Sequence, residues 1–297
     1  MTCNLSHYII GIDGGGSGCR AALSDSDGVR IGEATGGAAN FTTNPELAIK
    51  SVLEAAQEAA KSADIELDTL SHCVAHVGLA GILNASGAAR MAAALPFRQV
   101  NVTDDRPTST VGALGTEDGL LAAIGTGAFV AIQKNGAARF FGGWGFQISD
   151  HGSGAWLGRA AMERCLNVCD GLEPGSVLSN QVLTEFHNDP VEMVSFAKAA
   201  APSDFAALAP MVIKAGAKSD ALGRSIMTEG ARFINSCIGK ADLGESDIVC
   251  LTGGIGPHYA PYLDDRAKSL VRPAKGTALD GALMLAKAAS ENMECAG

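Results

Sequence analysis

The sequence predicts an α/β protein made of two lobes on the same plan. The chain has 297 residues and 47% hydrophobic content, which is enough to bury two cores. Short β-rich runs alternate with amphipathic helical patterns. The same series of elements occurs twice, from residue 8 and again from residue 119. Each series has a strand, a glycine-rich turn (here called the glycine tip), a second strand, a turn and a third strand. Such internal similarity indicates duplicated halves, each with its own sheet.

The first repeat opens with a strand over residues 8–12, which ends in Asp13 and a run of glycines. Residues 19–24 form a second strand rather than a helix, so the glycines lie at the tip of a β-hairpin. A Rossmann fingerprint needs a helix there and a Walker loop needs a lysine, so neither fits. Bare N–H groups at such a tip can cradle phosphate, with Asp13 placed to hold a hydrated Mg²⁺. The candidate phosphate-binding residues are Gly14, Gly15, Gly16 and Ser17, and a glycine turn without a ligand is the alternative.

The first lobe continues with alternating helices and strands. Thr43 and Glu46 have the spacing of a capping box for a helix that ends near residue 63. Asn40 comes just before this helix and offers a loop amide to a neighbouring cleft, although asparagine is also a common turn residue. A strand over residues 73–79 and a helix over residues 85–95 follow.

Two adjacent acids, Asp104 and Asp105, end the strand that begins at Gln99, and Pro107 follows in the first turn of a helix. Capping of that helix accounts for one carboxylate but does not require two. The carboxyl end of a strand is where α/β folds place their chemistry. A positioned carboxylate here suits a general base toward a sugar hydroxyl.

The second repeat has strands at residues 120–124, 129–133 and 138–141, with a tip formed by Gly125, Thr126 and Gly127. Two phosphate loops that face one cleft indicate nucleotide binding more specifically than a single loop does. The last core strand, residues 247–251, leads into Gly253 and Gly254. A glycine pair lets a flat base lie against the backbone, which predicts the adenosine side of a nucleotide pocket, with a plain turn as the alternative.

A glycine-rich segment over residues 141–159 predicts a sugar site. It holds a Gly-Trp-Gly loop, and Asp150 stands just before a helix that Ser153 caps. Close backbone N–H groups, an apolar ring and paired acceptors suit a sugar. The loop residues are Gly143, Trp144 and Gly145.

Composition excludes several classes of partner. The net charge of -10 leaves no basic stripe for nucleic acid. No run approaches the ~18 apolar residues of a membrane span, and the N-terminus lacks a signal-peptide pattern, so we expect a cytoplasmic protein without membrane contact. The eight cysteines contain no CxxC pair, which argues against a disulfide framework or a zinc site. A homodimer is left open.

The chain resembles the BadF/BadG/BcrA/BcrD ATPase family, which includes N-acetylglucosamine kinase and glucosamine kinase. Five segments carry the resemblance in the family's order and approximate spacing: IGIDGGGSGCR, VTDD, IGTGAF, GGWGFQISDHGSG and LTGGIG. The resemblance implies an actin-like ATPase (ribonuclease H-like) fold, with two duplicated lobes around a nucleotide cleft. We expect the lobes to be residues 1–115 and 116–297, with a terminal helix over residues 278–289 near the hinge.

The resemblance also implies site roles and an activity. ATP and Mg²⁺ are the implied cofactors, with both glycine tips on the phosphates, Gly253 and Gly254 on the adenosine, and Asp104 as the catalytic aspartate. The implied sugar contacts are Asn40, Gly143, Trp144, Gly145 and Asp150. Three positions depart from the family's usual pattern, namely Asp105-Arg106 after the aspartate, Ala128 and His151.

The implied activity is phosphorylation of the C6 hydroxyl of a small-molecule amino sugar, either glucosamine or N-acetylglucosamine. Two alternatives stay open. One is an iron–sulfur ATPase that activates a 2-hydroxyacyl-CoA dehydratase, which needs cysteines arranged at a dimer interface. The other is a sugar or nucleotide sensor without catalysis, although intact Asp13 and Asp104 argue against lost chemistry.

Overall fold

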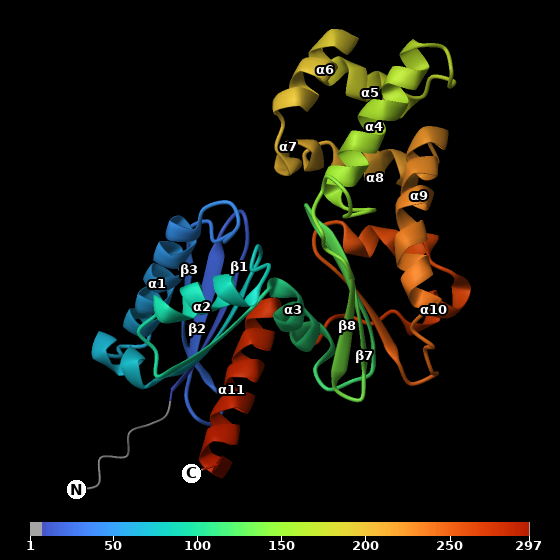
Figure 1. Cartoon of the computed structure of the whole chain (residues 1–297). Coiled ribbons are helices and arrows are strands. Elements are labelled where there is room, and N and C mark those ends of the chain that lie inside the picture. Colours follow the sequence, from blue (N-terminus) through green and yellow to red (C-terminus); the bar gives the residue numbers. More distant parts are fainter. Residues whose placement is uncertain (1–7, 297) are drawn as a thin grey trace, which may run out of the picture. The chain divides into compact units, whose positions relative to one another are not determined.

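The computed structural model describes residues 8–296, with side chains described up to Met293, and the chain forms two compact units (Figure 1). Unit 1 contains the residues up to Thr116 together with those from Ala274 onward, and unit 2 is Glu117–Pro273. Each unit has its own sheet and hydrophobic core. Within residues 8–296, no helix combines the length and apolar content that crossing a bilayer requires.

Unit 1 is built on a five-stranded sheet in the order β3-β2-β1-β4-β5. Its strands are β1 (Ile9–Gly14), β2 (Cys19–Ser24), β3 (Arg30–Gly36), β4 (Val74–Leu79) and β5 (Gln99–Thr103). The first three form the predicted antiparallel hairpins, whereas β4 and β5 run parallel to β1. The carboxyl ends of β1, β4 and β5 therefore meet at one edge of the sheet.

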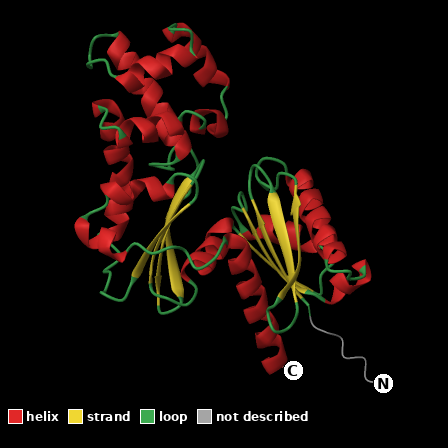
Figure 2. Cartoon of the chain, turned by 180° about the vertical axis from the view of Figure 1, so that it is seen from behind, coloured by secondary structure: helices red, strands yellow, loops and turns green. Residues whose placement is uncertain are grey.

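Helices cover both faces of this sheet (Figure 2). They are α1 (Pro45–Ser62), η1 (Leu67–His72), α2 (Ala85–Ala93), α3 (Asp105–Leu114) and α11 (Ala278–Ala296). Ile10 and Ile12 on β1 share a core with α1, whereas Ile9 packs with Ala286 of α11, as strand alternation requires.

The start of α1 differs from the prediction. Asn44, rather than Thr43, is the N-cap, and its side chain accepts a hydrogen bond from the Leu47 N–H at 3.0 Å. Pro45 follows at the first helical position, which its fixed φ favours. The capping box predicted for Thr43 and Glu46 is therefore wrong by one residue.

The assignment of the terminal helix to the second lobe is corrected by the structure, because α11 packs within unit 1. Glycines let α11 and α3 approach closely. A Cβ on Gly281 would lie 1.9 Å from the carbonyl oxygen of Thr108, and one on Gly112 would lie 1.9 Å from that of Thr277. This close backbone contact fixes α3, which carries the two adjacent acids.

Unit 2 repeats the meander of unit 1 in a four-stranded sheet of order β8-β7-β6-β9. Its strands are β6 (Gly119–Ile124), β7 (Ala128–Lys134), β8 (Ala137–Gly142) and β9 (Ile248–Thr252). The first three are antiparallel and β9 runs parallel to β6, as β4 does to β1. The predicted α/β fold with duplicated halves is thus confirmed.

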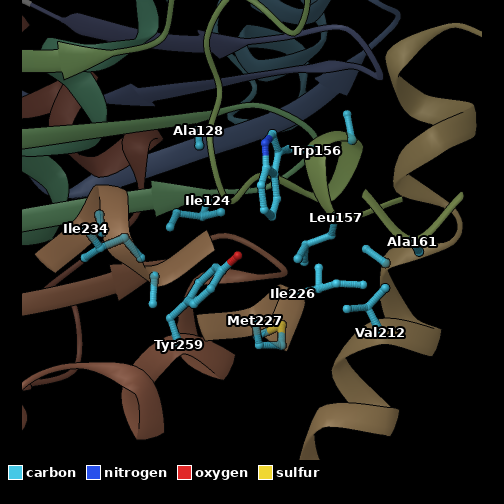
Figure 3. Packing of buried hydrophobic residues seen from close by; sticks show 14 of the residues in the cluster. Ile124, Ala128, Trp156, Leu157, Ala161, Val212, Ile226, Met227, Ile234 and Tyr259 are labelled. Carbon is cyan, nitrogen blue, oxygen red and sulfur yellow. The ribbon is translucent and has the colours of Figure 1, made fainter. Parts of the chain in front are cut away.

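The helices of unit 2 pack around a second core, part of which Figure 3 shows. They are α4 (Gly154–Cys169), α5 (Val177–Glu185), α6 (Pro190–Ala199), α7 (Pro202–Ala206), α8 (Ala209–Ala217), α9 (Ala221–Ile238), η2 (Gly256–Tyr262) and α10 (Asp265–Leu270). Ser153 caps α4 as predicted, accepting from the Trp156 N–H at 3.1 Å. The fully buried Tyr259 donates its hydroxyl to the Gly152 carbonyl at 2.7 Å, which ties η2 to the loop before α4.

The close contact of α3 and α11 gives a stability test. Gly281→Ala forces a methyl group against a backbone carbonyl, so we expect the free energy of unfolding to fall by about 1–3 kcal/mol. Gly239→Ala is the matched control, because a Cβ there would lie no nearer than 3.6 Å to another atom and φ is −61°. Denaturant titration of both variants measures the difference, and equal stability of the two would contradict the packing described.

Candidate active site

The strand register of the unit 1 sheet brings candidate site residues from separate segments to one edge of the sheet. Asp13 of β1 pairs with Gly78 of β4, and Gly78 pairs with Thr103 of β5. A Cβ on Gly78 would lie 2.5 Å from the side chain of Thr108, so α3 packs directly over β4. The N-terminus of α3, with Asp104 and Asp105, therefore lies at the same edge as Asp13, near the end of β1.

Asp104 stabilises the start of α3 at this edge. It is the N-cap of α3, and its Oδ1 accepts a hydrogen bond from the Arg106 N–H at 2.9 Å. The Arg106 guanidinium also donates from Nε to Oδ1 and from Nη2 to Oδ2, each at 2.9 Å. Both carboxylate oxygens are thus engaged by one arginine, an arrangement with strong geometric preference.

Asp105 has different surroundings, although it is the next residue. Burial, together with the negative charges of Asp104 and Asp13, raises the pKa of its carboxyl to about 6, against smaller opposing effects of a backbone hydrogen bond and of Arg106. The charge of Asp13 acts on Asp105 because the two acids face the same edge. A carboxyl with a pKa near 6 can exchange protons close to neutral pH, as a general base does.

The first glycine tip is anchored by its backbone and open at its surface. The Gly15 N–H donates to the Gly18 carbonyl, and the Gly15 carbonyl accepts from the Ala39 N–H, both at 2.9 Å. A Cβ on Gly15 or Gly16 would meet no atom within 4 Å. None of residues 14–18 has a positive φ. Neither packing nor φ requires glycine at these two positions, so their backbone is open to the close approach of a ligand.

Asp13 lies beside this tip. Arg20, its partner in the β1–β2 register, donates from Nη2 to Asp13 Oδ2 at 2.7 Å. Among residues 8–293, no three His, Cys, Asp or Glu side chains gather as a metal site. Asp13 nevertheless fits Mg²⁺ bound with a nucleotide, because that ion takes one or two carboxylates and completes its shell with phosphate oxygens and water.

Asn40 lies next to the first tip. Its Oδ1 accepts from the Thr43 N–H at 3.1 Å, and the neighbouring Phe41 N–H donates to the Ala80 carbonyl at 3.0 Å. Since Ala39 is bonded to Gly15, this loop and the glycine tip form one backbone-linked surface. The structure thus places Asn40 with the first phosphate-loop candidates.

The second glycine tip is held by the start of α4. The Gly154 N–H donates to the Gly125 carbonyl at 2.7 Å, and the Ala155 N–H to the Thr126 carbonyl at 3.2 Å. A Cβ on Gly125 would again meet no atom within 4 Å. The pattern found at Gly15 and Gly16 therefore recurs at the equivalent tip.

The predicted adenosine loop adjoins the second tip. Gly253 has φ +78°, and a Cβ there would lie 2.2 Å from the Ile124 carbonyl oxygen, so backbone packing requires this glycine. A Cβ on Gly254, in contrast, would meet no atom within 4 Å. The Ile255 N–H donates to the same Ile124 carbonyl at 3.0 Å, which joins the two loops.

Asp150 links the Gly-Trp-Gly loop to the second tip. It is buried with φ +57°, and its Oδ1 accepts from the Gly145 N–H at 3.3 Å. Its Oδ2 would lie 2.9 Å from a Cβ on Gly127. Burial raises the pKa of this carboxyl, while hydrogen bonds from the Gly145 and Ala128 backbones lower it. Trp144 has 72% of its surface exposed, so its ring is accessible to a ligand.

The site candidates therefore gather in two sets. Unit 1 carries the first glycine tip, Asp13, Asn40 and the two acids, and unit 2 carries the second tip, the glycine pair of residues 253–254 and the Gly-Trp-Gly loop with Asp150. Sequence reasoning missed Arg20 and Arg106, whose ion pairs change the surroundings of Asp13 and Asp104. The signal for Arg106 was its position two residues after a helix-capping acid.

This arrangement defines a two-unit α/β protein with an open glycine loop in each unit. The chain belongs to the BadF/BadG/BcrA/BcrD ATPase family, whose model matches residues 10–270. The predicted family and its actin-like ATPase fold are thereby confirmed.

Three similar proteins match over most of the chain. Glucosamine kinase GspK from Vibrio cholerae is 30% identical over 97% of this chain and 98% of its own length. An N-acetylmuramic acid/N-acetylglucosamine kinase from Clostridium acetobutylicum is 27% identical over 89% of this chain and 90% of its own length. A Chromobacterium violaceum structure, provisionally named an N-acetylglucosamine kinase, superposes with a TM-score of 0.86 at 30% identity, covering 95% of this chain and 99% of that one.

The raised pKa of Asp105 makes stability depend on pH. Its folded-state pKa of about 6 exceeds the ordinary value of 3.8, so the favourable contribution of the protonated form is present below pH 4 and lost as the pH rises through 6. We expect Asp105→Asn to raise the free energy of unfolding at pH 8 by about 3 kcal/mol, since one pKa unit corresponds to about 1.4 kcal/mol. At pH 4 we expect little change.

Denaturant titrations at both pH values measure this effect. Asp104→Asn is the control, because asparagine can still cap α3 but loses the charged pair with Arg106, so we expect a lower stability at pH 8. A loss of stability for Asp105→Asn at pH 8 would contradict the surroundings described for this carboxyl.

Proposed function

We propose that the protein is an ATP-dependent kinase that transfers the γ-phosphoryl group to the C6 hydroxyl of an amino sugar. The observation that carries the proposal is Asp105, a carboxyl with raised pKa at the strand edge where Asp13 and the open glycine tip also lie. The names of the relatives from Vibrio cholerae and Clostridium acetobutylicum support an amino sugar as the acceptor. The cytoplasm is the proposed place of action.

The general base in this proposal is Asp105, in place of the Asp104 expected from the sequence. The Asp104 carboxylate caps α3, and Arg106 engages both of its oxygens, so neither oxygen is open to a substrate hydroxyl. Asp105 is destabilised as an anion, so it gains most from taking up a proton. In the reaction, the Asp105 carboxylate accepts the proton of the sugar hydroxyl while that oxygen bonds to phosphorus and ADP leaves.

The glycine loops would hold the nucleotide. The loops of residues 14–17 and 125–127 would surround the phosphates. The N–H groups of Gly15 and Gly125 already donate to the Gly18 and Gly127 carbonyls, so those of residues 16–17 and 126–127 would serve the phosphates. Gly254 would lie against the adenosine. Asp13 would hold Mg²⁺, which supplies positive charge to the phosphates when bound. For Asp13 to do so, Arg20 must release its 2.7 Å contact, and an incoming phosphate offers that guanidinium another acceptor.

The sugar would contact Asn40, the Gly-Trp-Gly loop and Asp150. The exposed ring of Trp144 offers an apolar surface to the sugar's C–H groups. Gly143 and Gly145 would hold that ring in place, because their N–H groups donate to the Ala128 carbonyl and to Asp150. Asp150 would accept a hydrogen bond from the ammonium or amide at C2, and this bond would stabilise the buried negative charge of its carboxylate. We propose glucosamine as the first substrate to test, because the relative so named matches over 97% of the chain.

The iron–sulfur alternative receives no support from the cysteines. Among residues 8–293, Cys169 is exposed and the other five are buried, namely Cys19, Cys73, Cys165, Cys237 and Cys250. Burial raises the pKa of Cys19 and Cys165 to about 11, which disfavours the thiolate that a cluster needs.

The choice of base is tested by kinetics. We expect Asp105→Asn to lower kcat by roughly 100-fold or more, because a general base contributes about 10² to 10⁴. Asp104→Asn should change kcat less than about 10-fold, since asparagine still caps the helix. Coupled ADP-release assays with glucosamine measure both variants, and the reverse order would return the role of base to Asp104.

The choice of sugar is tested with glucosamine, N-acetylglucosamine and glucose in the same assay. Loss of a nitrogen that a site hydrogen-bonds leaves buried polar groups unpaired, so we expect glucose to have the lowest kcat/KM. Asp150→Ala should raise KM for the amino sugar about 10-fold or more and leave KM for ATP nearly unchanged. Fastest turnover of glucose by the wild-type protein would refute the amino-sugar assignment and leave the kinase assignment intact.

A further inference from the structure

His76 is a buried histidine that takes no part in the proposed reaction. It lies on β4 with 6% of its surface exposed. Strand alternation places it on the same face of the sheet as Val74, which packs with Ala286 of α11. Burial lowers the pKa of the imidazole to about 4, so the ring is neutral at pH 7. A neutral imidazole has one donor and one acceptor nitrogen, so its tautomer decides which partners it can hold.

The partner of His76 is Thr103, the last residue of β5. His76 pairs with Asn101 in the parallel register, and Thr103 comes two residues later on the same face of the sheet. This placement brings Thr103 Oγ1 within 3.1 Å of His76 Nε2. The side-chain pair therefore joins β4 to the end of β5, directly before the start of α3.

The Thr103 hydroxyl has a second partner, which fixes the direction of both hydrogen bonds. Its Oγ1 donates to the Asp104 carbonyl at 2.8 Å. A hydroxyl has a single proton, so toward His76 the same oxygen acts as an acceptor. His76 Nε2 must therefore carry the ring proton, which leaves Nδ1 without one in the neutral ring.

The Asp104 carbonyl belongs to the peptide group that joins Asp104 to Asp105. A peptide group is planar, so a bond that holds its oxygen also orients the bond from its nitrogen to the Cα of Asp105. Asp105 occupies the first helical position of α3, and its side chain starts from this Cα. The two hydrogen bonds that begin at β4 therefore hold the backbone from which the Asp105 carboxyl projects.

We propose that His76 is a positioning residue, which holds the Asp105 carboxyl in place through the Thr103 hydroxyl and the Asp104 carbonyl. The proposal rests on the proposed function, in which Asp105 is the general base. Alignment of such a base is critical, because a misplacement of about 1 Å can lower the rate roughly 100-fold. A histidine that only filled the core would stabilise the fold without this effect on the rate.

Replacement of His76 by two different amides tests the first hydrogen bond. Glutamine can place an amide N–H near the site of Nε2, whereas the shorter asparagine places it near that of Nδ1, so only His76→Gln can still donate to Thr103. We expect His76→Asn to lower kcat with glucosamine by roughly 10-fold or more and to leave KM for ATP nearly unchanged. His76→Gln should keep kcat within about 3-fold of the wild type. Equal kcat values for the two variants would overturn the proposal.

Thr103 offers a second matched pair of variants. Thr103→Ser keeps the hydroxyl and should turn over near the wild-type rate, whereas Thr103→Val removes the hydroxyl and should lower kcat as much as His76→Asn does. Because both changes break one chain of hydrogen bonds, we expect the double variant His76→Asn/Thr103→Val to be no slower than either single variant. Losses that multiply in the double variant would show independent effects and contradict the proposal.

Nuclear magnetic resonance tests the same hydrogen bonds without an assay of activity. Nitrogen spectra at pH 7, assigned with His76→Gln, should show the ring proton of His76 on Nε2. The pKa of the Asp105 carboxyl should fall in His76→Asn and stay raised in His76→Gln, because a displaced carboxyl is less buried. The opposite tautomer, or a pKa of Asp105 that is the same in both variants, would overturn the proposal. A wild-type protein that phosphorylates no sugar would refute the proposed function and leave these two results standing.

Discussion

The site in unit 1 depends on one constraint, the parallel register of β1, β4 and β5 beneath α3. That register sets Asp13 level with Gly78 and Thr103, and the missing side chain of Gly78 lets α3 lie over the strands. Close packing of α3 on α11 through Gly112 and Gly281 then fixes the helix N-terminus. The result is two carboxyls, Asp13 and Asp105, held at one edge at a cost in electrostatic free energy.

Adjacent acids acquire different properties from one helix start. The N-cap position turns the Asp104 carboxylate toward the backbone of α3 and within reach of Arg106, so that residue stabilises the helix. The first helical position directs Asp105 into a partly buried space that already holds negative charge. Stability and proton exchange are therefore divided between neighbouring residues, which is common where function needs a destabilised group.

The sequence predicted much of the fold because its signals were local. The two hairpins, the glycine tips and the Ser153 cap follow from short patterns and are found as expected. The partner of α11 was not predictable in this way, because Gly112 and Gly281 are 169 residues apart and their contact is tertiary. The choice between Asp104 and Asp105, like that between Thr43 and Asn44, depends on which residue begins a helix, and patterns locate helix ends only to within a residue or two.

The most direct test of this account is the pKa of the Asp105 carboxyl, followed by carbon NMR of the labelled side chain, with Asp105→Asn used to assign the signal. The account requires a pKa near 6 in the wild-type protein and a lower pKa in Asp13→Asn, since removing that negative charge relieves part of the shift. A wild-type pKa near 4, or one that Asp13→Asn leaves unchanged, would contradict the claim that the strand register brings these two carboxyls together.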